Sequence, residues 1–303
     1  MSKFFKKLVL FIIIPLAIGS VLAACENNDN PASAKNDAKK EVREETRQEE
    51  IKEDSLQEAA DLSGHISIVG STSVQPLAQL LADAFTDIEP EVVIDVQGVG
   101  SSAGIKAVND GSADIGMASR ELNEEEKTWG ITEIPIAVDG IAVIVNPNNP
   151  VNNLTLEEIA KIYKGEITNW KDVGGKDREI IVVSREEGSG TRGAYDEIVG
   201  IEGELLKNAL IQNGNGPVRA KVMSTEEAIG YISLGYVDDS VKAISVDGVE
   251  PSEEKIKSGE YPVSRRLLML TKGEVPPYVQ AYLDFILGPE GEKIVSKNYV
   301  VAN

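Results

Sequence analysis

The chain has 303 residues, of which 50 are acidic and 30 are basic, so its formal net charge at pH 7 is −20. An acidic protein of this kind is a poor partner for nucleic acids and anionic membranes. It can still bind a small anion, because surface charge is screened over about 8 Å at physiological salt while a cleft is governed by local dipoles. The single cysteine excludes an intrachain disulfide and a cysteine-based metal site.

The N-terminus has the pattern of an export signal. Three lysines among the first seven residues precede an apolar stretch that runs from Leu8 to Ala24, which is typical of a signal peptide rather than a long membrane span. The stretch ends in Leu-Ala-Ala-Cys and resembles the lipobox of bacterial lipoproteins. Residues 1–24 would then be removed, and Cys25 would be the lipidated first residue of the mature chain. The alternative is an ordinary signal peptide or an anchor helix that contains a cysteine.

Residues 25–61 are polar and carry mixed charges. They contain too few large apolar residues to bury much surface, so they predict a flexible tether between the lipid and the folded body. A coiled coil or partner helix is the alternative, but no apolar heptad is sustained here. The remaining residues, 62–303, form a long segment for a single hydrophobic core, and their number suits two lobes of about 120 residues each.

Strands and helices alternate through the body. Apolar, β-branched runs predict strands at 66–69, 92–96, 114–118, 134–145, 180–183, 218–223, 241–246 and 267–270. Apolar spacing and capping residues predict helices at 74–85, around 105–108, from near 123, from 155, at 188–198, from 225 and at 279–287. Repeated β-α units imply an α/β protein whose sheets are mainly parallel and whose ligand sites lie at the carboxyl ends of strands.

Turns rich in hydrogen-bond donors follow three of the predicted strands, at Gly70–Ser73, Gly100–Gly104 and Arg185–Arg192. A strand that turns through Gly, Ser and Thr into a helix presents free backbone N–H groups and the positive end of the helix dipole. Arg185 adds a forked, charged donor. A single turn of this kind is usually only a helix cap, and a lone arginine is usually a surface ion-pair partner. Three such turns together indicate one enclosed, dehydrated oxyanion.

Five segments in this order resemble the phosphate-binding lipoproteins of bacterial phosphate ABC importers: Gly70–Pro76, Gly98–Gly104, Ala113–Arg120, Tyr163–Trp170 and Arg185–Thr191. The resemblance implies a periplasmic-binding-protein type II fold. In that fold two α/β lobes, each a mainly parallel sheet flanked by helices, hold the ligand in the cleft between them. Lobe I would comprise residues 62–139 plus 246–303, and lobe II residues 140–245, with crossovers at 134–145 and 241–246.

The resemblance also implies which residues contact the ligand. Thr72 and Ser73 match the donors of the first loop, and Ser101 matches the hydroxyl of the second. The donors of the second lobe match Arg185, Ser189, Gly190 and Thr191. Glu187 stands where the family has an acidic residue that orients the arginine.

One position departs from the family pattern. Longer members have an aspartate after the third strand that accepts the proton of hydrogen phosphate and helps to exclude sulfate. Ser119 stands there in this chain and Arg120 follows it, so this acceptor is missing. We expect Arg120 to add positive potential, and Asp139 to act as the replacement acceptor near the crossover. The alternative for Asp139 is a turn residue before Gly140, and the choice of phosphate over sulfate stays open.

The function implied is a binding protein that is lipid-anchored outside the cell membrane, captures inorganic phosphate and delivers it to the permease subunits of an ABC importer, without cofactor or metal. Alternatives are a binding protein for another tetrahedral oxyanion, a phosphate-sensing lipoprotein or, less compatible with the residues, a phosphatase-type enzyme. Gly188–Gly190 invites comparison with a hydrolase nucleophile turn. The only histidine, however, is His65, which we expect at a strand edge, so no base is at hand for a serine nucleophile.

Overall fold

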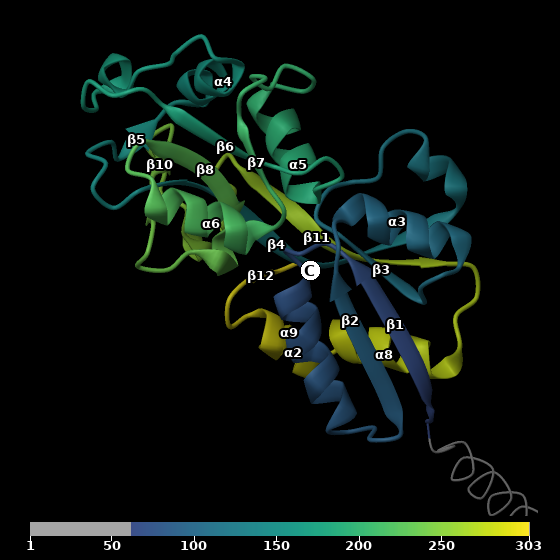
Figure 1. Cartoon of the computed structure of the whole chain (residues 1–303). Helices are drawn as coiled ribbons and strands as arrows, with labels where there is room; N and C mark the ends of the chain where they lie inside the picture. The colour runs from purple at the N-terminus through teal and green to yellow at the C-terminus, as the bar shows by residue number, and fades with distance from the viewer. Residues whose placement is uncertain (1–61, 303) are drawn as a thin grey trace, which may run out of the picture. The chain divides into compact units, whose positions relative to one another are not determined.

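The computed structural model describes residues 62–302 (Figure 1). The predicted signal peptide, the predicted lipidation at Cys25 and the predicted tether lie outside the described residues. Within residues 62–302, no helix has both the length and the apolar character needed to cross a membrane.

The strands are β1 (Gly64–Gly70), β2 (Val92–Gly98), β3 (Ile115–Ala118), β4 (Ile131–Val145), β5 (Asn153–Leu154), β6 (Ile181–Arg185), β7 (Leu210–Gln212), β8 (Ala228–Ser233), β9 (Lys242–Ala243), β10 (Ser245–Val246), β11 (Ser264–Lys272) and β12 (Val300–Val301). The helices are α2 (Gln75–Thr86), α3 (Ser101–Asp110), α4 (Leu156–Lys164), α5 (Gly190–Val199), α6 (Asn215–Ser224), α7 (Glu253–Lys257), α8 (Pro277–Leu287) and α9 (Pro289–Val295). Single 3₁₀ turns occupy Glu126–Trp129, Trp170–Val173 and Leu234–Tyr236.

One long strand, β4, is shared by two sheet halves. The strands follow the order β2-β1-β3-β11-β4-β8-β6-β7. Residues 131–140 of β4 pair with β11, whereas residues 141–145 pair with β8. The pairs of β1 with β2 and β3, and of β6 with β7 and β8, are parallel. The two-lobe α/β fold expected from the sequence is confirmed, and Figure 1 shows β4 and β11 running between the lobes.

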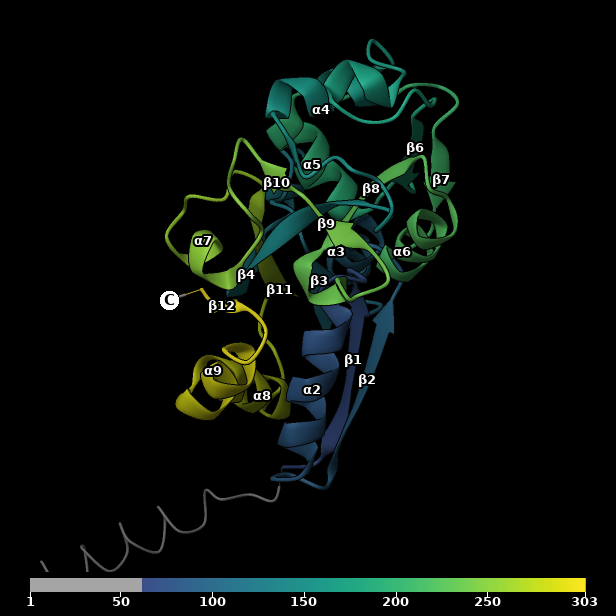
Figure 2. The same ribbon diagram turned by 90° about the vertical axis from the view of Figure 1, so that its left-hand side faces the viewer.

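The first lobe carries helices on both faces of its sheet. Alternate residues of β11 enter different cores, because successive side chains of a strand point to opposite faces. Leu267 and Met269 pack with α2, α8 and α9, while Leu268 and Leu270 pack with α3. Figure 2 shows α2, α8 and α9 grouped together beneath β4 and β11. Burial on both faces explains why these strands read as unbroken apolar runs.

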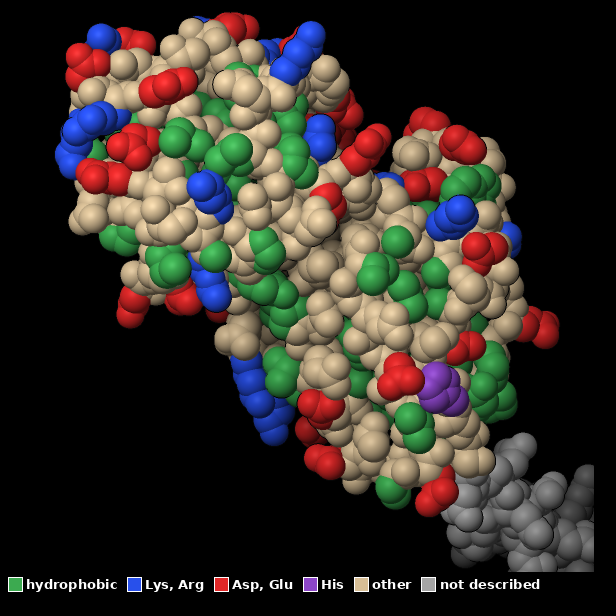
Figure 3. Space-filling view, in the orientation of Figure 1, with side chains coloured by type: hydrophobic (Ala, Val, Ile, Leu, Met, Phe, Trp, Pro, Cys, Tyr) green, Lys and Arg blue, Asp and Glu red, His purple; other side chains and the backbone are tan. Residues whose placement is uncertain are grey.

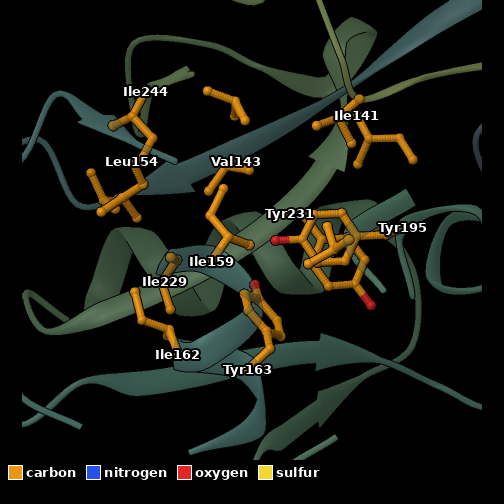
Figure 4. Packing of buried hydrophobic residues seen from close by; sticks show 14 of the residues in the cluster. Ile141, Val143, Leu154, Ile159, Ile162, Tyr163, Tyr195, Ile229, Tyr231 and Ile244 are labelled. Atoms are coloured by element: carbon orange, nitrogen blue, oxygen red, sulfur yellow. The ribbon is translucent and has the colours of Figure 1, made fainter. Parts of the chain in front are cut away.

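The second lobe repeats this arrangement around the other half of β4. Ile141 and Val143 face a large core beneath α4 and α5, whereas Ala142 and Ile144 face α6. In the larger core the rings of Tyr195 and Tyr231 stack with their centroids 3.8 Å apart, and Tyr163 meets Tyr195 edge-on (Figure 4). This packing holds α5, and with it the Arg185–Arg192 turn, against β6 and β8.

The capping box predicted at the start of α4 is confirmed. The Thr155 hydroxyl accepts from the backbone N–H of Glu158 at 3.1 Å, and the Glu158 carboxylate accepts from the backbone N–H of Thr155 at 2.8 Å. These two bonds satisfy two donors that a helix start otherwise leaves free.

Two predicted elements have the wrong type, and the helix predicted from near 123 is only the 3₁₀ turn Glu126–Trp129. Residues 218–223 form part of helix α6 rather than a strand, and residues 228–233 form the buried strand β8 rather than a helix. Val218 and Val222 satisfy both a two-residue and a four-residue period, so the pattern alone does not choose. The helix is favoured because both valines then pack on the apolar core beneath β4 and β8.

The predicted strand at 241–246 is divided into β9, which pairs with β4, and β10, which pairs with β5. Ile256, Tyr261 and Val263 still pack in the core of the second lobe. We therefore propose that the chain re-enters the first lobe at Ser264, not near residue 246.

Candidate anion-binding site

The predicted donor turns meet where the two lobes face each other. The turn after β1 leads into α2, the turn after β2 leads into α3, and the turn after β6 leads into α5. Gly190, the first residue of α5, lies so close to α3 that a Cβ atom there would be 2.1 Å from the Ser101 hydroxyl oxygen. Because carboxyl ends of parallel strands and the N-termini of the following helices share one edge of a sheet, the folding of each lobe brings its donors to this boundary.

Three serine hydroxyls of the first lobe form a buried cluster. Ser71 Oγ donates to Ser119 Oγ at 2.8 Å, and Ser101 Oγ accepts from the backbone N–H of Ser119 at 3.1 Å. The Ser101 and Ser119 hydroxyl oxygens are 3.4 Å apart. All three side chains are buried, so this cluster is a dry, polar wall.

Several hydrogen bonds cross from one lobe to the other. Ser73 Oγ lies 2.9 Å from Thr191 Oγ1, and the backbone N–H of Ser102 donates to the carbonyl of Gly188 at 3.1 Å. The Tyr236 hydroxyl donates to the carbonyl of Thr72 at 2.8 Å. The lobes are therefore in contact at the donor turns, and an ion held there would be enclosed.

Arg185 is the buried cation of the second lobe, with 1% of its surface exposed. Its Nε and one terminal nitrogen donate to the two carboxylate oxygens of Glu186, each at 2.8 Å. That terminal nitrogen also donates to Thr72 Oγ1 across the lobe boundary at 3.2 Å. Burial opposes ionisation of Glu186, but the hydrogen bonds and charge of Arg185 outweigh it and lower the pKa of Glu186.

The prediction that Glu187 orients the arginine is wrong. Glu187 is exposed, and its neighbour Glu186 forms the forked pair with Arg185. Two consecutive glutamates after a strand point in different directions, and the sequence does not say which one turns toward the arginine.

Sequence reasoning missed Asn215, the first residue of α6. Its side-chain Nδ2 donates to Ser73 Oγ at 3.0 Å, while its Oδ1 accepts from the backbone N–H of Ser233 at 3.1 Å and from Arg185 at 3.3 Å. The available signal was the Gly-Asn-Gly-Pro turn at 214–217. It is a further glycine-containing turn between a strand and a helix, and it brings the N-terminus of α6 to the same place.

Arg265 was also missed, and it pairs with a residue that was predicted. Arg265 and Asp139 are direct register partners on the antiparallel strands β11 and β4, and their charged groups are 3.0 Å apart. Arg265 also donates to Ser73 Oγ at 3.0 Å and to the carbonyl of Ser119 at 3.2 Å. Burial raises the pKa of Asp139, and the nearby Arg265 charge opposes that rise. The signal in the sequence was the pair of arginines, 265 and 266, directly before the apolar run 267–270.

The chain is similar to known binding proteins. The sequence matches the PBP superfamily domain over residues 55–290. The phosphate-binding protein PstS of Bacillus subtilis is 31% identical over 292 residues, which cover 95% of this chain and 91% of the relative. PstS of Borreliella burgdorferi is 31% identical over 244 residues, with 77% and 88% covered. The chain belongs to the PstS family of phosphate-binding proteins.

Solved structures extend the likeness to three dimensions. A protein from Clostridium perfringens that was solved with bound phosphate is 50% identical, with a TM-score of 0.77 over 78% of this chain and 99% of that one. An ABC-type phosphate transport receptor from Vibrio cholerae is 38% identical, with a TM-score of 0.69 over 78% of this chain and 100% of that one. These PstS-type relatives are solute-binding proteins, not enzymes.

Most residues predicted from the PstS resemblance come together at the lobe boundary: Thr72, Ser73, Ser101, Ser119, Arg185, Ser189, Gly190 and Thr191. The Ser189 hydroxyl caps α5 by accepting from the backbone N–H of Arg192 at 3.2 Å. Arg120 lies nearby, and its side chain is already hydrogen-bonded within the first lobe. Its guanidinium donates to Glu126 at 2.7 and 2.8 Å and to Ser102 Oγ at 3.0 Å, so a carboxylate already neutralises its charge.

The single histidine lies far from these turns. His65 stands at the start of β1, whereas the donor turn follows the end of that strand. Its exposed ring is 2.8 Å from Asp95 on β2 and appears as the purple side chain on the outer surface in Figure 3. Its position at an exposed strand edge is as predicted. It therefore supplies no base to the serines of the site.

Proposed function

We propose that the protein captures inorganic phosphate between its two lobes and delivers it to the permease of an ABC importer. The observation that carries the proposal is the contact between the lobes, where Ser73 hydrogen-bonds to Thr191 and Arg185 donates to Thr72. Hydroxyls, backbone N–H groups at helix starts and one forked cation are the donors that bind a dehydrated oxyanion. The names of the relatives select phosphate within that class.

The proposed ligand contacts are the hydroxyls of Thr72, Ser73, Ser101, Ser119, Ser189 and Thr191, the backbone around Gly190, and the Arg185 guanidinium. Closing the lobes around phosphate removes it from water, which strengthens every charge-dipole interaction in the cleft. Opening the lobes breaks the cross-lobe bonds and lets the ion in or out, as in other hinge-type binding proteins. We propose that Arg120 shapes the cleft wall through Ser102 without contacting the ion.

Titration calorimetry with phosphate, arsenate, sulfate and molybdate tests the proposal. We expect one site per chain that binds phosphate most tightly. Stronger binding of another of these anions would favour the alternative oxyanion receptor, and no binding at all would contradict the proposal. Whether importer membrane subunits are encoded beside this gene separates a transport component from a sensor.

We further propose that the protein is a lipoprotein anchored through Cys25 on the outer face of the cell membrane. The support is the Leu-Ala-Ala-Cys sequence after the apolar stretch. Cys25→Ser should release the protein to the medium or leave the precursor unprocessed, as judged by fractionation and mass spectrometry. A membrane-bound variant of normal mature mass would contradict the anchor.

A further inference from the structure

We propose that Arg265 is a second cationic ligand of the bound anion, and that Asp139 positions it rather than contacting the ion. The proposal rests on the proposed function and specifies how its site recognises charge. It replaces the expectation that Asp139 accepts a proton from the ligand.

The position of Arg265 is the first argument. Its guanidinium donates to the hydroxyl of Ser73 and to the carbonyl of Ser119, and these residues lie in two of the loops that form the first-lobe wall. Only 7% of Arg265 is exposed, and its buried Nε–H has no acceptor among the described residues. An unsatisfied N–H on a buried cation is costly. An anion beside the Ser73 hydroxyl would supply the missing acceptor.

The direction of the Ser73 proton is the second argument. A serine hydroxyl has two acceptor sites and one proton. Arg265 and Asn215 both donate to Ser73 Oγ, each at 3.0 Å, and the Asn215 amide orientation is set by two groups that donate to its Oδ1. Both acceptor sites of Ser73 are therefore filled. Its proton must point outward, to Thr191 Oγ1 at 2.9 Å or to an oxygen of the ligand.

The third argument is that the Asp139 carboxylate is already paired within the protein. Its Oδ2 accepts from Arg265 at 3.0 Å, and both side chains are buried. As the register partner of Arg265 on the strands that join the lobes, Asp139 holds the guanidinium in place from the hinge side. Arg185 is neutralised by Glu186 in the same manner. The cleft thus presents donors from two arginines, and Asp139 keeps one of them oriented.

The decisive experiment is titration calorimetry with inorganic phosphate and with sulfate on four variants of the protein. Arg265→Gln should weaken phosphate binding on the order of tenfold or more, since charged hydrogen bonds are the strong ones. Arg265→Lys should recover part of the loss because it keeps the charge but not the planar fork. The matched control is Arg266→Gln, the next residue of β11, whose exposed side chain pairs with Glu121. It should bind phosphate as the wild type does.

Asp139→Asn tests the positioning role. An amide oxygen still accepts from Arg265, so phosphate and sulfate affinities should change by the same factor and their ratio should stay within about threefold of wild type. A proton-accepting Asp139 would instead predict a shift of the ratio toward sulfate. A change confined to the fraction of active protein would appear in the calorimetric stoichiometry, not in the dissociation constant.

Each result bears on the proposal separately from the function. If the wild type binds phosphate and Arg265→Gln and Arg265→Lys match Arg266→Gln, Arg265 is not a ligand and the inference fails while the function stands. If Asp139→Asn shifts the anion ratio on the order of tenfold, Asp139 contacts the ion and its positioning role is wrong. If the wild type binds no phosphate, the proposed function itself fails.

Discussion

Arg185 illustrates how much of the site depends on single residues. It is a fully buried guanidinium that links Glu186, Asn215 and Thr72. Arg185→Ala should reduce phosphate affinity roughly a hundredfold, on the order of 3 kcal/mol, because the anion would lose this cation and the Glu186 carboxylate would be left without its partner. Arg185→Lys should restore only part of the affinity. Calorimetry measures both, with the exposed Arg178→Ala as control. Affinity of the alanine variant within about threefold of wild type would remove Arg185 from the site.

At the scale of an element, α5 acts by bringing its first turn against the other lobe. A Cβ at residue 190 would lie 2.1 Å from Ser101 Oγ and 2.8 Å from Ser101 Cβ, so rotating the hydroxyl would not relieve the clash. Gly190→Ala should therefore impede closure and weaken phosphate binding on the order of tenfold or more, with little change in the Tm of the unliganded protein. Gly216→Ala in α6 is the control, since nothing lies within 4 Å of that Cβ. Equal affinities for the two variants would show that the lobes do not close as described.

The same helix carries a buried carboxyl group whose titration should be measurable. Burial raises the pKa of Asp196 to about 6, although Arg192 opposes the rise; Glu202 adds to it. Between pH 3.8 and about 6, Asp196 therefore keeps its proton in the folded protein but has lost it in the unfolded chain. This group's contribution to stability falls as pH rises from 3.8 to about 6 and is constant above that range. The Tm of Asp196→Asn minus the Tm of the wild type should therefore increase as pH rises through this range.

Thermal unfolding followed against pH measures that difference, and Asp172→Asn at an exposed position is the control. Parallel curves for wild type and Asp196→Asn would contradict the raised pKa. Asp196 also bears on the site, because Arg192 connects it to the carbonyl of Arg185 at 3.2 Å.

For the whole molecule, affinity depends on how well the closed state is stabilised, since a ligand shifts a conformational equilibrium only by its preference for one state. The bond from the Tyr236 hydroxyl to the Thr72 carbonyl exists only when the lobes meet. Tyr236→Phe should cost about 1 kcal/mol of closure and weaken phosphate binding about fivefold. Tyr278→Phe on α8 of the first lobe should leave affinity unchanged. If Tyr236→Phe and Tyr278→Phe bind phosphate with equal affinity, the Tyr236 hydrogen bond does not stabilise the closed state.

Features that depend on neighbours in the chain were predictable from the sequence. Donor turns such as Gly70–Ser73, the arginine at the end of β6 and the Thr155 capping box follow from side chains a few residues apart, because helix starts and tight turns have local chemistry. The resemblance to phosphate-binding lipoproteins added the order of these turns, and with it the two-lobe fold.

The rest was decided by tertiary structure. Ser73 meets Arg265 across 192 positions and Asn215 across 142, and nothing local marks such partners. The choice between Glu186 and Glu187, and between helix and strand at 218–233, depended on which arrangement buries apolar faces and pairs every buried charge. The sequence by itself determined that this protein has an oxyanion site built from turns. Only the packing of two lobes onto β4 and β11 decided which charges enclose it, because a buried ion pair forms only where distant strands are brought into register.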